Sequence, residues 1–209
     1  MGLIEIIQTN TDPGKAATTL IYKSIEESKI ARVITAEPQK SLVTGNKWIT
    51  DENRDAAVYI AIWYLIKNYE SNNKRFTFVE TRKIVYYSCY ISPNTNNHDF
   101  EEYPNRLKIS IKKHKKVVFA RDLNAKSRVW GSKERDKRGR ILLDWMAEMN
   151  LIIHNKARDP NFISQEGSSH IDLLTTTEKI GNQVKNWRIT DHRRRKPKQT
   201  WQYLLQYFM

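Results

Sequence analysis

The first forty residues alternate between short apolar runs and polar turns. This pattern predicts a strand over residues 3–10 and, after an Asp-Pro-Gly turn, a helix over 14–28 whose apolar side chains recur at helical spacing. A second strand is predicted over 30–38, with Glu37 at its end. A strand, a helix and a strand in succession indicate a βαβ unit whose two strands run parallel.

The middle of the chain is rich in β-branched and aromatic residues. Strands are predicted at 56–66, 76–79 and 84–92, and because no helix separates them we expect antiparallel pairing and a mixed sheet. A helix is expected at 103–115, with Pro104 in its first turn, where proline is tolerated.

In the second half, residues 117–120 are uncharged and predict a buried strand. Short strands are also expected at 151–154, 171–174 and 184–189. Residues 138–149 are typical of a surface helix with one buried face. The apolar stripe of that helix would consist of Ile141, Leu142, Trp145, Met146 and Met149.

Asp122 and Asn124 follow the strand 117–120 and lie two residues apart. Side chains at this spacing in an extended segment point the same way, so the carboxylate and the amide can converge on one target. A phosphate suits such a pair, because the carboxylate can orient or deprotonate a water while the amide donates to a phosphate oxygen. The alternative is that both side chains cap the following turn.

Other predicted strands also end in polar side chains. Gln8 and Asn10 end the first strand and Glu37 lies at the end of the second, so Asn10 and Glu37 are expected to meet in one crevice. Glu37, which precedes a proline, is alternatively a solvated loop acid. Tyr90 lies near the end of the strand 84–92 and could donate to a phosphate or belong to the core.

Composition limits the class of protein. The 209 residues are 39% hydrophobic and 11% aromatic, which fits one sizeable globular domain, and no apolar run is long enough to span a bilayer. A lone cysteine, Cys89, excludes an internal disulfide framework and indicates a reducing compartment. No Cys/His spacing typical of zinc sites is present.

The positive charge is concentrated in two segments. The formal net charge is +13; residues 111–140 hold twelve Lys/Arg against three Asp/Glu, and 193–198 add five Lys/Arg. Clustered cations bind phosphate backbones by releasing counterions, so we expect a nucleic-acid partner. The alternative is a solvated basic face that aids solubility. The first segment also contains Asp122 and Asn124, which favours nucleic acid.

The strand ends, taken in order, form a series of short motifs. They are Gln8-x-Asn10, Glu37-Pro38, Ser88-x-Tyr90-x-x-Pro93, Asp122-x-Asn124-Ala125, Ser169-x-Ile171-Asp172-Leu173 and Thr190-Asp191-His192. This series resembles the endonuclease/exonuclease/phosphatase superfamily, which includes deoxyribonuclease I and apurinic/apyrimidinic endonucleases. Three stretches resemble more closely the endonuclease domain of arthropod non-long-terminal-repeat retrotransposons: Asn124-Ala-Lys-Ser-x-x-Trp-Gly-Ser132, Asp136-x-Arg-Gly139 and Gly167-Ser-Ser-x-Ile-Asp172.

The resemblance implies an α/β fold, a deoxyribonuclease I-like four-layer α/β/β/α sandwich of two mixed sheets. It also implies Mg²⁺-dependent hydrolysis of a DNA phosphodiester, with Mn²⁺ as an alternative cation, leaving a 3′-hydroxyl for target-primed reverse transcription. DNA is the implied partner, and no membrane is expected. The oligomeric state cannot be predicted.

The resemblance also assigns roles to single residues. The implied metal ligands are Glu37, Asn10 and Asp191. The implied catalytic residues are His192, which is oriented by Asp172 and contacts the phosphate or transfers a proton; Asp122, which acts on the attacking water; and Asn124 and Tyr90, which bind the phosphate. Nucleic-acid contacts are expected from Lys126, Arg128 and Arg121.

Some positions depart from the family pattern. Arg121 and Leu123 stand where the family has Gly and Phe, and Thr190 stands where it has Ser. An ion pair with Arg121 would lower the pKa of Asp122 and its use as a base. After residue 192 the family continues into a final apolar strand. Here we expect a domain over 1–192 and an unrelated basic and aromatic tail over 193–209.

Two alternatives to an active retrotransposon endonuclease follow. One is a catalytically decayed remnant that only binds nucleic acid through its basic face. The other, a phosphatase acting on small phosphoesters, is disfavoured by the charge distribution. A DNA substrate, together with the single cysteine, implies an intracellular location, nuclear or nucleocytoplasmic.

Overall fold

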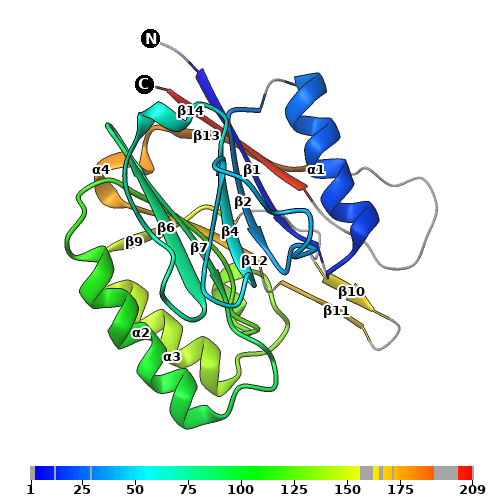
Figure 1. Cartoon of the computed structure of the whole chain (residues 1–209). Helices are drawn as coiled ribbons and strands as arrows, with labels where there is room; N and C mark the ends of the chain where they lie inside the picture. The colour runs from blue at the N-terminus through cyan, green and yellow to red at the C-terminus, as the bar shows by residue number, and fades with distance from the viewer. Residues whose placement is uncertain are drawn as a thin grey trace.

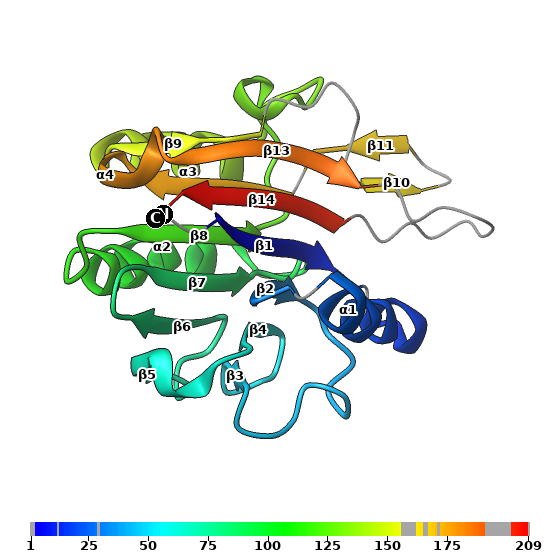
Figure 2. The same ribbon diagram turned by 90° about the horizontal axis from the view of Figure 1, so that it is seen from above.

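The computed structural model describes residues 3–11, 13–28, 30–155, 162–164, 167–170, 172–190 and 202–208. Over these residues two six-stranded sheets pack face to face (Figures 1 and 2). The strand order in the first sheet is β13 (Val184–Thr190), β14 (Gln202–Phe208), β1 (Leu3–Asn10), β2 (Arg32–Ala36), β4 (Ala56–Ile60) and β3 (Trp48–Thr50).

The second sheet packs against the face of the first sheet that is opposite helix α1 (Lys15–Ser28). Its strand order is β5 (Ile66–Glu70), β6 (Phe76–Thr81), β7 (Val85–Tyr90), β8 (Val117–Asp122), β12 (Asp172–Thr177) and β9 (Leu151–Ile153). The pairs β1/β2 and β7/β8 are parallel and the neighbouring pairs are antiparallel, so both sheets are mixed, as expected. A separate hairpin joins β10 (Phe162–Ser164) to β11 (Gly167–Ser169).

Helices cover both outer faces of the sandwich. Helix α1 (Lys15–Ser28) lies on the first sheet, and α2 (Asn97–Ile111) and α3 (Lys137–Glu148) lie side by side on the second (Figures 1 and 2). Shorter helical turns are η1 (Trp63–Leu65), η2 (Arg128–Trp130) and α4 (Glu178–Gly181). The four-layer α/β/β/α sandwich is thereby confirmed. No helix in the described part of the chain is long and apolar enough to cross a membrane.

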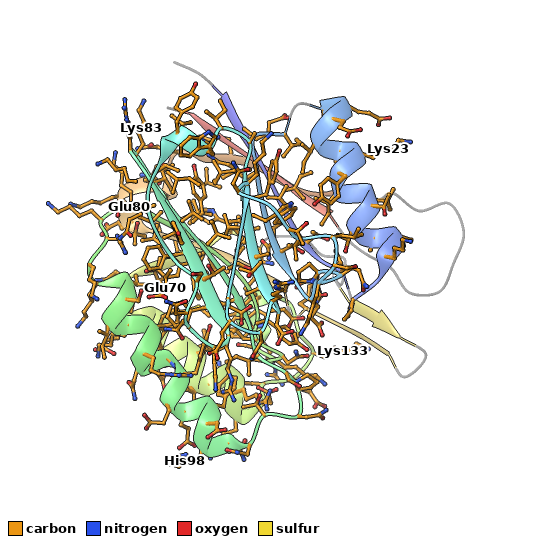
Figure 3. The ribbon with its side chains drawn as sticks, in the orientation of Figure 1. Lys23, Glu70, Glu80, Lys83, His98 and Lys133 are labelled. Carbon is orange, nitrogen blue, oxygen red and sulfur yellow. The ribbon has the colours of Figure 1, made fainter. Side chains whose placement is uncertain are left out.

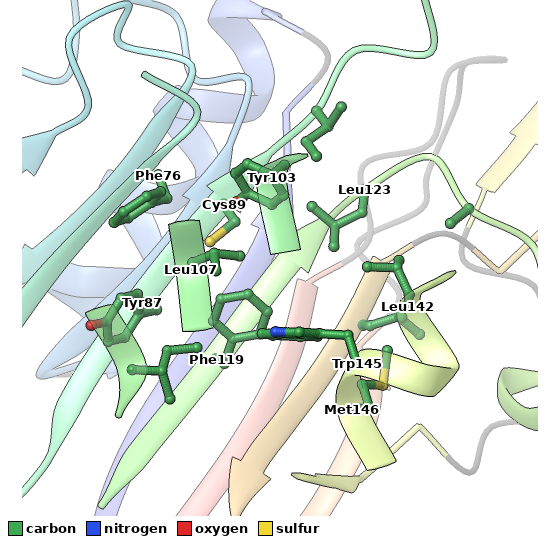
Figure 4. Packing of buried hydrophobic residues seen from close by; sticks show 14 of the residues in the cluster. Phe76, Tyr87, Cys89, Tyr103, Leu107, Phe119, Leu123, Leu142, Trp145 and Met146 are labelled. Carbon is green, nitrogen blue, oxygen red and sulfur yellow. The ribbon is translucent and has the colours of Figure 1, made fainter. Parts of the chain in front are cut away.

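Alternation along the strands divides the apolar side chains among three cores. In β2, Val33 packs toward α1 while Ile34 faces the second sheet. In β8, Val118 lies between the sheets and Phe119 packs under α2 and α3, against Trp145 (Figure 4). Strands covered on both faces are apolar on both faces, which is why residues 117–120 form an unbroken apolar run.

The predicted strand 56–66 is corrected by the structure. It is two strands: β4 ends at Ile60 in the first sheet, η1 follows, and β5 begins the second sheet at Ile66. Apolar residues continue through the crossover, where Trp63 and Tyr64 are exposed, so no polar residue marks the break between the two strands. The short strand β3 was not predicted.

The predicted start of the helix 103–115 is also wrong. Helix α2 begins at Asn97, because the side chain of Asn96 caps it by accepting a hydrogen bond from the Asp99 amide at 2.9 Å. Pro104 therefore lies within the helix and is buried, rather than in its first turn. Tyr103, Leu107 and Ile111, which recur at helical spacing, are buried on the inner face of this helix.

Part of the segment predicted as an unrelated tail forms a strand. Residues Gln202–Phe208 form β14, which pairs antiparallel with β1 on one side and with β13 on the other. The apolar and aromatic residues of this segment therefore complete the first sheet. The boundary predicted at residue 192 lies outside the described residues and stays a prediction.

Candidate active site

Three predicted site residues meet at one edge of the sandwich, where strands of both sheets end. The side-chain nitrogen of Asn10, at the end of β1, donates to Glu37 Oε2 at 3.0 Å and to Asp122 Oδ2 at 2.6 Å. Glu37 follows β2, the parallel neighbour of β1, and Asp122 ends β8 of the opposite sheet. One amide group thus links two carboxylates that are far apart in the sequence.

The backbone at Glu37 is held in an unusual conformation. Its φ is 48°, in the left-handed region that residues other than glycine rarely adopt. The Glu37 amide donates to Asp55 O at 2.7 Å, and Thr11 Oγ1 donates to Glu37 O at 2.6 Å. Such strain persists where the surroundings determine the conformation, and it is concentrated at functional sites.

Asp51 supports this arrangement, and sequence reasoning missed it. Its buried carboxylate accepts hydrogen bonds from the amides of Asp55 at 2.7 Å, Ala56 at 2.8 Å and Arg75 at 3.0 Å. Burial raises its pKa, although these bonds act in the opposite direction. In the sequence, Asp51 looks like any solvated turn acid, because its partners are backbone groups that carry no sequence signal.

Tyr90 lies beside Glu37. Its hydroxyl hydrogen-bonds the Glu37 carboxylate, and burial together with this carboxylate raises the pKa of Tyr90. The hydroxyl therefore keeps its proton at neutral pH and acts as a donor. The Tyr90 amide donates to Arg75 O at 3.0 Å, so the end of β7 is tied to the same backbone that Asp51 holds.

Asp122 is 1% exposed. Burial raises its pKa to about 7, with a further contribution from the Glu37 charge, while hydrogen bonds from the Asn124 amide and the Asn10 side chain lower it. Desolvation is the dominant effect, and the expected lowering by an ion pair with Arg121 stays a prediction. The side chain of Arg121 lies outside the described part of the structure.

Asn124 turns the chain away from β8. Its φ is 46°, a conformation that asparagine tolerates better than most residues. The Asn124 amide donates to Asp122 Oδ1 at 3.0 Å, and its side-chain nitrogen donates to Ile91 O at 2.9 Å. The turn-capping alternative thus describes the backbone amide, while the side chain ties the turn to the end of β7.

Asp172 is brought to the same place by strand pairing. It is the direct partner of Asp122 in the antiparallel β8/β12 ladder, and both residues line a small cavity between the sheets. Two hydrogen bonds join the two sheets in this region. Gln8 Nε2 donates to Leu173 O at 3.2 Å, and Ser88 Oγ donates to Thr35 O at 2.8 Å. Asp172 is buried as well.

Asp191 and His192, predicted as a metal ligand and a catalytic residue, lie outside the described residues. The strand before them is described. Thr190, the last residue of β13, pairs with Gln202 of β14, which on its other side pairs with Thr9 of β1. The roles of Asp191 and His192 stay predictions.

The basic loop after β8 is built on buried residues. Trp130 is buried and donates from Nε1 to Ala125 O at 3.3 Å, while Ser132 Oγ donates to His170 O at 3.2 Å. Lys126 and Arg128 are exposed on this loop, close in sequence to Asp122. Their predicted contacts with nucleic acid are compatible with that exposure and stay predictions.

Gly139 allows α3 to pack closely against the same loop. A Cβ atom there would lie 1.9 Å from the carbonyl oxygen of Lys126. Alanine usually stabilises a helix relative to glycine by about 1 kcal/mol, but this clash forces the backbone apart. We therefore expect Gly139→Ala to lower the free energy of unfolding by about 1–3 kcal/mol, measured by urea titration.

The neighbouring exposed residue provides the control. Arg140→Ala on the same helix turn should change the free energy of unfolding by no more than about 0.5 kcal/mol. If Gly139→Ala were as stable as the parent chain, the close approach between α3 and the loop would not exist.

The chemistry of the described residues fits a hard divalent cation. The carboxylates of Glu37 and Asp122 can supply oxygen ligands, and a bound cation would relieve the repulsion between their negative charges. The side chain of Asn10 lies between the two carboxylates. Within the described residues no three His, Cys, Asp or Glu side chains gather as a metal cluster. Mg²⁺ needs only one or two carboxylates, because it retains several waters and takes substrate oxygens.

The chain matches a family model described as endonuclease-reverse transcriptase over residues 84–194, which is more than half of its length. No curated protein matches it.

Several solved structures share its fold. The endonuclease domain of TRAS1, a telomere-specific non-LTR retrotransposon, is 22% identical, with a TM-score of 0.80 and 98% of each chain covered. The 3′-5′ exonuclease NExo from Neisseria meningitidis is 8% identical and an AP endonuclease from Archaeoglobus fulgidus is 10% identical; each has a TM-score of 0.73 and covers 99% of this chain and 100% of its own. These likenesses establish the deoxyribonuclease I-like fold.

Proposed function

Because the chain belongs to the endonuclease-reverse transcriptase family, we propose that it is a metal-dependent DNA endonuclease of a non-LTR retrotransposon. It hydrolyses a DNA phosphodiester and leaves a 3′-hydroxyl for target-primed reverse transcription. The observation that carries this proposal is the convergence of Glu37 and Asp122 on the Asn10 amide, beside an exposed basic loop. An arthropod source and a nuclear or nucleocytoplasmic location are inferred from the sequence alone.

The residues divide the chemical work. Glu37, Asn10 and Asp191 would hold Mg²⁺, or Mn²⁺ in its place, which when bound supplies charge neutralisation at the phosphate. Asp122 orients or deprotonates the attacking water. Its carboxylate is buried and accepts a hydrogen bond from the Asn124 backbone amide, and together these two features fix the orientation of the carboxylate.

Phosphate binding falls to the donors around this centre. On DNA binding, the Tyr90 hydroxyl, which keeps its proton, would turn from Glu37 to a phosphate oxygen, and the second N–H of the Asn124 side chain would donate to another. His192, oriented by Asp172, contacts the scissile phosphate or transfers a proton. Lys126, Arg128 and Arg121 bind the flanking DNA backbone.

Nicking of supercoiled plasmid tests the proposal. With Mg²⁺ we expect relaxed circles that a DNA ligase can reseal, because the nick carries a 3′-hydroxyl. Removal of the cation with EDTA should stop nicking, and excess Mg²⁺ should restore it. The matched control is the Glu37→Ala, His192→Ala double variant; nicking no faster than this control would refute the activity.

A decayed remnant is the second candidate, favoured by Arg121 standing where the family has glycine. This candidate binds DNA without cutting it. Its signature would be an affinity that falls steeply as salt rises, with no Mg²⁺-dependent relaxation of plasmid.

A further inference from the structure

A second basic site lies at the far end of the second sheet. An open pocket of about 590 Å³ is formed by the turn between β6 and β7 and the loop between α2 and β8. These segments precede Val85 and Val117, the paired first residues of the parallel strands β7 and β8. Asp122 is at the other end of β8, about 17 Å away for a strand of six residues. The pocket is therefore separate from the candidate active site.

The lining of this pocket is strongly cationic. Five exposed Lys/Arg side chains line it against one carboxylate, Glu80, and none of the five forms an ion pair with any residue in the described part of the chain. The half-buried ring of His114 also lines it, packed edge-on against Phe78. Figure 3 shows Lys83 at the opposite end of the molecule from Lys133, which lies on the loop after β8. The five cations are Arg82, Lys83, Lys113, Lys115 and Lys116.

Exposed aromatic side chains lie on the turn that leads into the strand beside the pocket. Trp63 is 60% exposed and Tyr64 69% exposed, on the turn η1. This turn leads directly into β5, whose first residue, Ile66, pairs with Thr81 in the pocket lining. Two large aromatic rings exposed to solvent indicate a binding surface, because a bound partner that covered them would remove their apolar area from water.

We propose that this end of the domain binds single-stranded nucleic acid, with its phosphates on the cations of the pocket and unpaired bases stacked on Trp63 and Tyr64. Cations and exposed rings together are the two parts of a single-strand site, since phosphates reward clustered Lys/Arg and every unpaired base has a face that can stack. A duplex would use the cations alone, because its bases are already stacked on one another. An acidic peptide or an anionic membrane would likewise leave the base-stacking function of the rings unused.

Single-strand binding at this pocket does not depend on nuclease activity. The single strand would lie at one end of the sandwich, while the proposed cleavage of duplex DNA takes place at the other. The two proposals can therefore fail separately.

Fluorescence anisotropy with a labelled 15-nucleotide single strand tests the site, with EDTA present to prevent cleavage. The variant Lys83→Gln, Lys115→Gln should bind about tenfold more weakly or worse, and the slope of log affinity against log salt should fall by about 1.4, since two phosphate contacts are lost. The control Lys23→Gln, Lys47→Gln removes the same charge from exposed positions outside the pocket lining and should bind as the parent does.

A second variant separates stacking from charge. Trp63→Ala, Tyr64→Ala should weaken single-strand binding about fivefold or more without changing the salt slope, and should leave duplex binding unchanged. Thermal melting by circular dichroism checks that this variant is folded. DNA and RNA strands of the same sequence are compared in parallel, and the tighter one identifies the natural strand.

Two outcomes overturn the proposal. One is that the lysine double variant and the aromatic double variant both bind the single strand as tightly as the Lys23→Gln, Lys47→Gln control. The other is that duplex competes as well as the single strand while the aromatic variant is unchanged, which would indicate a general polyanion surface. Plasmid nicking by the pocket variants should equal that of the parent chain; a parent that binds the single strand but never nicks refutes the endonuclease alone.

Discussion

Replacing Glu37 by glutamine is expected to lower the rate of Mg²⁺-dependent plasmid nicking by at least about a hundredfold. Glutamine keeps an oxygen that can accept from Asn10 and Tyr90, so the local hydrogen bonds survive. It loses the negative charge that a divalent cation requires from its main protein ligand. The loss should therefore appear in activity rather than in folding.

A nearby acid gives the matched control. Glu52→Gln removes one charge from an exposed side chain in the loop before β4, and it should nick at the parent rate. Raising the Mg²⁺ concentration should restore part of the activity of Glu37→Gln, because a weakened metal site can be filled by mass action. An unchanged rate in Glu37→Gln would remove Glu37 from the metal site.

Local sequence patterns predicted those parts of the fold that depend on neighbours in sequence. The βαβ unit of β1, α1 and β2 could be predicted because its helix and strands have different hydrophobic periods, and a parallel pair places Asn10 beside Glu37. Asp122 could also be predicted as a site residue, because it is a polar residue at the end of an apolar run. These are strand-end residues, and strand ends are visible in a sequence.

Long-range pairing was not visible. The segment 202–208 has the composition of a strand, but five Lys/Arg and a proline in 193–198 separate it from β13, so its place between β1 and β13 could not be inferred. The crossover at residues 61–65 was hidden for the opposite reason, because Ile62, Trp63 and Tyr64 are apolar or aromatic although they are exposed.

The supporting residues of the site were hidden because they act on the backbone. Asp51 and Thr11 hold Glu37 through peptide groups, and peptide groups are the same at every position. The resemblance did include Trp130 and Gly139, but the structure gives them packing roles: one anchors the basic loop and the other lets α3 approach it. Residues that identify a family thus include many that position the chemistry without taking part in it.

The second large effect is expected for Asp122→Asn, which should reduce nicking by about 10²–10⁴-fold because an amide cannot accept the proton of the attacking water. Asparagine has nearly the same shape, and its side-chain oxygen can still accept from the Asn124 amide. A loss of this size without unfolding would assign Asp122 a chemical role. A rate within about twofold of the parent would exclude it.

Stability against pH, measured without metal, separates this chemical role from a structural one. The folded-state pKa of Asp122 is raised to about 7, above the ordinary value near 3.8, because ionising a buried carboxylate costs solvation. Its contribution to stability is therefore present below pH 4 and is lost as the pH rises through 7. Relative to the parent chain, Asp122→Asn should gain stability from pH 4 to pH 8, since the amide never ionises. Suppose that Asp122→Asn is inactive at pH 8 and that its stability relative to the parent chain is greater at pH 8 than at pH 4. The Asp122 carboxylate would then be needed for its charge, although its ionisation destabilises the fold.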